Sequence, residues 1–284
     1  MKTRTVLTLT LVAAIAGCGG DSSSNDRTVV ASFYPLAFAA QQIGGTGIDV
    51  RNLTPPGVEP HDLELSGSDV RTIADADLVL YFGEGFQPSL EDAIDSTSAH
   101  AVDLLGAVET RAGGVEEHGA DPHVWLDPVR YATIAERIGD ELDRRPEAEQ
   151  FAARLRALDR DFRAGLSDCD RDEFVTSHAA FGYLAERYRL KQVAITGISP
   201  ETEPTPRDLE EVVREVRAIG ATTVFFETLV SPRLAETVAR EVGAQTAVLD
   251  PLEGLTEEEI AAGEDYVSVM RENLAALQKA LGCR

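Results

Sequence analysis

Positive charge is scarce in this sequence. Its 284 residues include 26 Lys and Arg against 49 Asp and Glu, which gives a formal net charge of −23. A chain this acidic repels phosphate backbones, so nucleic acid is not expected among its partners. The hydrophobic content of 43% is ordinary and sufficient for buried cores. A chain of this length forms one large domain or two domains of ordinary size.

Long hydrophobic runs are nearly absent. The one run of note, from Val6 to Ala16, follows a positively charged start and is too short to span a membrane as a mature helix. It leads into Gly17 and Cys18, and this junction resembles the lipobox of a lipoprotein signal. We therefore expect residues 1–17 to be a signal peptide and Cys18 to be acylated; an ordinary secretory signal is the alternative. The polar, Ser-rich residues 18–27 are expected to form a flexible tether.

Cysteine is rare as well, with three residues in all. If Cys18 carries a lipid, Cys169 and Cys283 remain. An even pair outside the cytoplasm is usually oxidised, so we expect a disulfide that closes a loop of roughly 115 residues. Two buried free thiols are the alternative. The wide spacing does not fit a cysteine zinc site.

Short apolar runs alternate with amphipathic segments along the whole chain. The expected strands are residues 28–34, 48–53, 78–82, 101–104, 173–176, 192–195, 222–226 and 246–249. Helical patterns lie between most of them. This alternation predicts an α/β fold with two lobes, each a mainly parallel sheet flanked by helices.

A longer helical pattern separates the two halves and begins near Pro146. Its apolar residues recur at spacings of three and four: Phe151, Leu155, Leu158, Phe162 and Leu166. We expect an N-terminal lobe at residues 28–145, an interlobe helix at 146–168 and a C-terminal lobe at 169–284. An ordinary surface helix is the alternative for the middle segment.

Histidine is scarce too, yet three of the five histidines occupy comparable positions. His61 and His123 each follow a proline, and His178 stands just after an expected strand. Asp250 ends the last expected strand. Ligands of open α/β sheets bind at the carboxyl ends of the strands. Three imidazoles and one carboxylate suit a borderline divalent metal.

Four segments around these residues occur in a characteristic order. They are PPGVEPHDLELS, DPHVWLDP, FVTSHAAFGYLAERY and VLDPLEGLT. Together they resemble the metal-binding lipoproteins of bacterial and archaeal ABC importers, the cluster A-I substrate-binding proteins for zinc and manganese. The resemblance implies a monomeric, lipid-anchored receptor outside the cell membrane that serves an ABC permease and its ATPase. It also implies a long, rigid interlobe helix.

The same resemblance implies the metal ligands. They would be His61 and His123 from the first lobe, and His178 and Asp250 from the second. Zinc is the expected cargo, because manganese members of the family tend to place Glu at the position of His178 and manganese favours oxygen ligands. Manganese remains the alternative, since the His-rich insertion of many zinc members is reduced here to the short segment around His118.

Two other classes of protein share some of these features. A metal-dependent hydrolase needs an open coordination position and a general base, and the sequence has no His-Glu-x-x-His motif. We therefore expect no enzymatic activity and no catalytic cofactor. An adhesion lipoprotein would use the same fold. Glu59 is expected to be a solvated loop residue or an acceptor for a ligand, and Glu227 to line the cleft without binding metal.

Overall fold

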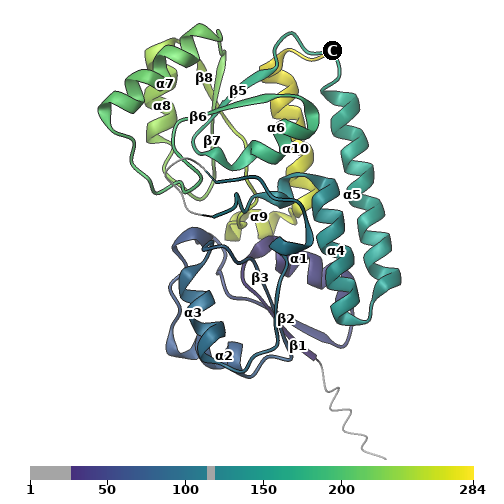
Figure 1. Ribbon diagram of the computed structural model, residues 1–284. Coiled ribbons are helices and arrows are strands. Elements are labelled where there is room, and N and C mark those ends of the chain that lie inside the picture. Colours follow the sequence, from purple (N-terminus) through teal and green to yellow (C-terminus); the bar gives the residue numbers. More distant parts are fainter. Residues whose placement is uncertain (1–26, 114–118) are drawn as a thin grey trace, which may run out of the picture.

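The computed structural model describes residues 27–113 and 119–284. The chain forms two lobes, each built on a four-stranded sheet (Figure 1). The expected signal peptide and nearly all of the expected tether, with Cys18, lie outside the described residues, as does His118.

The first lobe has the strand order β2-β1-β3-β4, and neighbouring strands pair in parallel. Its strands are β1 (Arg27–Ala31), β2 (Ile48–Asn52), β3 (Leu78–Tyr81) and β4 (Ala101–Asp103). Its helices are α1 (Tyr34–Gly44), α2 (Gly67–Ala74), α3 (Pro88–Ser96) and α4 (Pro128–Leu142).

The second lobe repeats this topology in the order β6-β5-β7-β8, again with parallel pairs. Its strands are β5 (Glu173–Thr176), β6 (Lys191–Ala194), β7 (Thr223–Phe226) and β8 (Gln245–Val248). Its helices are α6 (Gly182–Tyr188), α7 (Pro206–Ala218), α8 (Arg233–Val242), α9 (Glu257–Ala262) and α10 (Tyr266–Leu281). The predicted two-lobed α/β fold is confirmed.

Both faces of each sheet are covered, because successive side chains of a strand point to opposite faces. In β1, Val29 packs into the core that contains α1, α4 and α5, whereas Val30 packs with α2 and α3. In β5, Phe174 shares the core of α6 and α10, whereas Val175 packs with α7 and α8. Strands buried on both faces explain why the sequence shows continuous apolar runs rather than alternation.

The two lobes share one continuous core, which runs along helix α5 (Arg145–Gly165). This helix lies beside α4, α1 and α10, and Figure 1 shows it along the side of both lobes. Its expected apolar residues are all buried: Phe151, Leu155, Leu158, Phe162 and Leu166. A helix buried along its length in both lobes is a stiff connection, as the resemblance implied.

Helix starts follow the capping chemistry of the sequence. The side chain of Asp127 accepts hydrogen bonds from Val129 N and Arg130 N, and Pro128 takes the first position of α4. The closing helix α10 begins at Tyr266, because Asp265 caps it, and the separate helix α9 precedes it.

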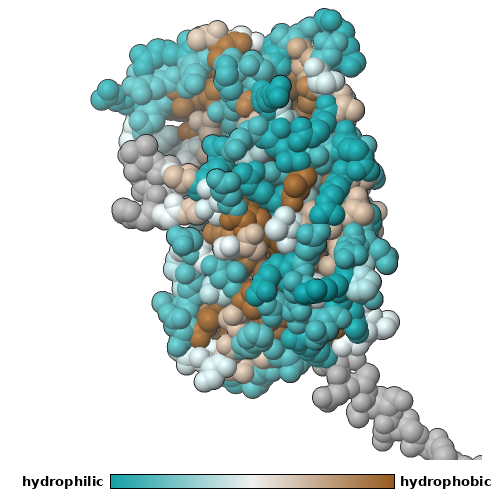
Figure 2. Space-filling view, turned by 45° about the vertical axis from the view of Figure 1, so that its right-hand side comes forward, coloured by the Kyte–Doolittle hydropathy of each residue, from teal (hydrophilic) through white to brown (hydrophobic). Residues whose placement is uncertain are grey.

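Cys169 and Cys283 form the expected disulfide, and their backbones pair in an isolated antiparallel bridge. The bond ties the segment before β5 to the residue that follows α10 by two positions. Within residues 27–113 and 119–284, no helix combines the length and the apolar character needed to cross a bilayer. Figure 2 shows that the face seen there is largely hydrophilic, with hydrophobic residues visible in small patches.

Candidate metal centre

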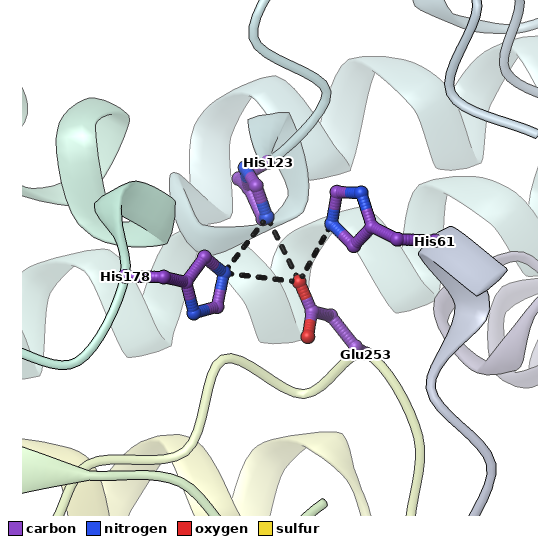
Figure 3. Close-up of side chains that lie close together, drawn as sticks. All are labelled: His61, His123, His178 and Glu253. Atoms are coloured by element: carbon purple, nitrogen blue, oxygen red, sulfur yellow. Dashed lines mark hydrogen bonds and ion pairs between the residues drawn. The ribbon is translucent and has the colours of Figure 1, made fainter. Parts of the chain in front are cut away.

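Four side chains from both lobes point toward one another between the sheets: His61, His123, His178 and Glu253 (Figure 3). One potential ligand atom from each lies within 4.8 Å of the others. Glu253 Oε1 lies 2.8 Å from His123 Nε2 and 3.3 Å from the Nε2 atoms of His61 and His178. Three of the four residues are buried, and only His61 keeps a partly exposed position.

Each histidine lies in or next to a short 3-10 turn, in a connection that follows a strand. His61 lies within the 3-10 turn Pro60–Asp62, in the long connection after β2. His123 immediately precedes the turn Val124–Leu126, after β4. His178 lies two positions beyond β5 and precedes another such turn. The structure thus brings together the three histidines that the sequence singled out.

The fourth member differs from the expected one, because Asp250 lies outside the cluster and Glu253 stands in its place. The Asp250 carboxylate accepts hydrogen bonds from Leu252 N at 2.7 Å and from the Thr228 hydroxyl at 2.8 Å. Asn273 bonds both backbone groups of Asp250. Leu252 adopts a left-handed conformation, with φ of 57°. Asp250 therefore shapes the turn that carries Glu253 to the histidines.

The spacing of the four atoms fits one transition-metal ion. Zinc bonds of roughly 2.0–2.1 Å in a tetrahedron place ligand atoms about 3.4 Å apart. His123 Nε2 and His178 Nε2 are 3.4 Å apart, and the contacts of Glu253 Oε1 are 2.8–3.3 Å. The widest pairs, which lie within 4.8 Å, would have to close toward this spacing for the four atoms to enclose an ion.

Two carboxylates outside the cluster orient two of the rings. Asp121 Oδ1 lies 2.8 Å from His123 Nδ1, and Glu227 Oε1 lies 2.6 Å from His178 Nδ1. The hydroxyl of Ser177 also donates to Glu227. A carboxylate on Nδ1 fixes the proton there and leaves Nε2 free to bind a metal. Glu227 was expected to line the cleft, and Asp121 was not singled out although it begins the DPH motif.

Glu59 is buried, so its interpretation as a solvated loop acid is wrong. Its Oε1 accepts a hydrogen bond from His61 N at 3.0 Å, and the residue is 8% exposed. Burial, together with the nearby Glu253 carboxylate, raises the pKa of Glu59 to about 10. Glu59 is therefore neutral at neutral pH and supports the His61 turn rather than adding charge to the cluster.

Charges of both signs are concentrated in the cluster. Burial by itself lowers the pKa of His123, but hydrogen bonds to Asp121 and Glu253 outweigh burial and raise it. Burial is likewise outweighed at His178, where Glu227 and Glu253 raise the pKa well above its usual value. Burial opposes ionisation of Glu253, yet the histidines hold its pKa well below the ordinary range. A metal ion must compete with protons for the ring nitrogens.

A cavity of about 300 Å³ borders the exposed side of His61. Phe86 and Pro122 from the first lobe and Ile198 from the second lie in its wall. The cavity is a route by which a hydrated ion could approach the otherwise buried cluster.

Two α/β lobes around a shared, nitrogen-rich cluster define a class of bilobal protein with a candidate metal site between the lobes. The comparison with protein families agrees with this class. Residues 29–280 match the ZnuA family, described as "Zinc-uptake complex component A periplasmic", and the chain belongs to that family. The family is one of transport components and not of enzymes.

Known relatives are similar over nearly the whole chain. The zinc-binding lipoprotein AdcA of Streptococcus pneumoniae serotype 4 is 38% identical over 98% of the chain, which spans 61% of that relative's length. The crystal structure of the Zn(II)-bound ZnuA-like domain of S. pneumoniae AdcA has a TM-score of 0.77, covering 90% of this chain and 99% of that one at 38% identity. The laminin-binding protein Lmb of Streptococcus agalactiae, described as a bifunctional protein with adhesin and metal transporting activity, has a TM-score of 0.81 at 31% identity, over 90% and 99% of the two chains.

Proposed function

We propose that this protein is the extracytoplasmic receptor that captures zinc and delivers it to an ABC importer. The observation that carries the proposal is the convergence of His61, His123, His178 and Glu253 from both lobes on one point. Two residues from each lobe would let a single ion hold the lobes together. The cargo would be bound and released without chemical change.

Zinc is the proposed metal, because three nitrogens and one oxygen suit zinc better than manganese, which favours oxygen ligands and higher coordination numbers. With Glu253 in place of Asp250 as the oxygen donor, the site still has three nitrogen ligands and one oxygen ligand. Competition titration of metal-stripped protein should show one equivalent of zinc bound much more tightly than manganese. The His178→Glu variant should show a smaller difference between its affinities for zinc and for manganese. Equal or tighter binding of manganese by the unaltered protein would assign manganese instead.

The proposed partners are an ABC permease and its ATPase. The family's role in a zinc-uptake complex supports them. A strain without the protein should grow poorly in zinc-chelated medium and recover with the unaltered gene. Recovery with a variant lacking both His123 and Glu253 would contradict delivery through this site.

A lipid anchor at Cys18, a monomeric state and lobes at 28–145 and 169–284 joined by helix 146–168 complete the proposal. The charged start, the apolar run and the lipobox-like junction support the anchor. Cys18→Ala should release the protein from membranes. An unaltered protein that carries no acyl mass would refute the anchor.

Adhesion is a second candidate function, favoured by the similarity to S. agalactiae Lmb. Binding of the purified protein to laminin-coated surfaces would test it, with a metal-site variant as the matched sample. Saturable binding that both samples share would support an adhesive role independent of the metal. A metal-dependent hydrolase has no comparable support.

A further inference from the structure

A second concave site lies at the opposite end of the second sheet from the metal centre. Four residues of its wall, Arg171, Asp172, Arg189 and Leu190, directly precede β5 and β6, whereas the metal cluster follows the strands' carboxyl ends. The cavity has a volume of about 480 Å³. In Figure 1 this end of the lobe lies near the C-terminus.

Arginine dominates the wall of this cavity. Four arginines line it, Arg163, Arg171, Arg187 and Arg189, together with the single carboxylate of Asp172. The whole chain carries 49 acidic residues against 26 basic ones, so the cavity reverses the sign that prevails over the molecule. Such a reversal in a concave site concentrates positive potential.

Two of the arginines are fixed by a buried acid. Asp159 accepts hydrogen bonds from Arg163 Nε at 3.2 Å and from Arg187 Nε at 2.6 Å. Arg187 also lies 3.1 Å from Asp127. These two guanidinium groups are therefore held in place by Asp159 and Asp127, whose carboxylates also offset their charge.

The other two arginines have no such partner. Among the residues that the structure describes, neither Arg171 nor Arg189 forms an ion pair or a side-chain hydrogen bond. Their backbones are nevertheless anchored, because Arg171 N donates to Leu281 O and Arg189 N donates to Glu186 O. Both guanidinium groups are exposed and free to meet a ligand in the cavity.

The position of Arg189 is unusual for an arginine. It ends α6 in the left-handed conformation, with φ of 60°. Helices α8, α9 and α10 end in the same conformation on glycine, which adopts it without strain. Helix α4 ends on Asp143, a residue type that tolerates the region. The backbone favours glycine here, so Arg189→Gly would remove the guanidinium group without straining the turn.

We propose that this cavity binds an oxyanion of the phosphate class through Arg171 and Arg189. Guanidinium groups offer paired N–H donors whose geometry matches the oxygens of such anions. The buried ring of Tyr188 lies in the cavity wall and excludes water from one side. Free phosphate and the phosphate of a lipid headgroup share this chemistry.

Calorimetric titration of the full chain with inorganic phosphate, at ionic strength held constant with NaCl, tests the site. We expect one equivalent to bind, and Arg171→Gln and Arg189→Gly each to weaken binding roughly tenfold or more. Arg189→Gly suits the left-handed backbone, so the thermal midpoint should not fall. Arg145→Gln is the matched control, because Arg145 is exposed and paired with Asp140 outside this cavity. Zinc affinity should stay unchanged in all three variants.

A second experiment with lipid vesicles distinguishes free phosphate from the phosphate of a lipid headgroup. Cosedimentation with phosphatidylglycerol vesicles, lost in Arg189→Gly and competed by free phosphate, would assign the anion to a headgroup. Binding of phosphate without cosedimentation would assign a free anion. Absence of both kinds of binding, or binding that Arg171→Gln and Arg189→Gly leave intact, would overturn the proposal.

Discussion

Glu253 Oε1 lies 2.8 Å from His123 Nε2, although 130 positions separate the two residues in the chain. His123 follows β4 of the first lobe, and Glu253 follows β8 of the second. The contact therefore closes the gap between the two sheets at the point where their carboxyl ends face each other. If a metal ion replaced the proton between His123 Nε2 and Glu253 Oε1, these two side chains would still face each other across the ion.

The assignment of Glu253 rather than Asp250 can be tested directly. Glu253→Ala should weaken zinc binding by more than about 100-fold, since loss of an outer hydrogen-bonding partner alone costs roughly 10–100-fold. Asp250→Asn keeps an oxygen that can accept from Leu252 N, so it should cost less than about tenfold. Titration against a chromophoric chelator measures both. The reverse ranking would restore Asp250 as the ligand.

The two orienting carboxylates should matter for affinity even though they do not reach the ion. Asp121→Asn and Glu227→Gln should each weaken zinc binding by roughly 10–100-fold, because the ring loses the partner that fixes its proton on Nδ1. Ser177→Ala is the matched control, since it removes one hydrogen bond to Glu227 and leaves the contact with His178. An equal loss in Ser177→Ala would mean that general packing, not ring orientation, sets the affinity.

Zinc affinity should fall as the pH decreases, and the fall should begin above the ordinary histidine range. Neighbouring carboxylates outweigh burial and raise the pKa values of His123 and His178, so protons compete with zinc at a higher pH than for a free imidazole. The pKa of Glu253 is lowered, so the carboxylate stays ionised and does not contribute to the fall.

Dissociation constants measured from pH 8 to pH 5 test this expectation. Asp121→Asn removes a carboxylate that raises the pKa of His123, so the decline should move to lower pH in that variant. An affinity that stays constant over the whole range would rule out a site of three histidines.

Loss of the disulfide should lower stability without altering the metal cluster. The bond joins residues 114 positions apart. Without this cross-link the unfolded chain gains conformational freedom, which lowers the free energy of unfolding by about 2–5 kcal/mol. The double variant Cys169→Ser, Cys283→Ser should show this decrease in the free energy of unfolding, measured with urea. Its zinc affinity should stay close to the original. Reduction of the disulfide in the unaltered protein should lower the free energy of unfolding to the same extent. An unchanged free energy of unfolding after reduction would show that the disulfide does not stabilise the fold.

The three histidines of the cluster were predictable because local chemistry marks them. Proline before His61 and His123, and a strand before His178, place each side chain in or beside a short turn in a connection that follows a strand. The start of α4 also has a local signal, because Asp127 caps the helix and Pro128 takes its first position. These features depend on residues close in the chain, where steric and hydrogen-bonding rules are strongest.

Other features depend on contacts between distant residues. Nothing in the Asp-Pro-Leu-Glu sequence indicates that Leu252 adopts a left-handed conformation, and this turn decides that Glu253 rather than Asp250 reaches the histidines. Glu59 is buried close to Glu253, a residue of the second lobe that is distant in the sequence. Helix α9 could have been predicted from the sequence. Thr256 and Glu259 form a capping box at its start, but they lie in a run of glutamates that has no clear apolar face.

The single tryptophan occupies the junction between the lobes. The indole Nε1 of Trp125 donates to Pro251 O at 2.7 Å, and the hydroxyl of Tyr266 donates to Trp125 O. Its ring centroid lies 5.1 Å from that of His123. The molecule therefore carries an intrinsic optical probe at the junction of its lobes, and its emission wavelength should shift if water replaces Pro251 O as the acceptor of the indole N–H hydrogen bond.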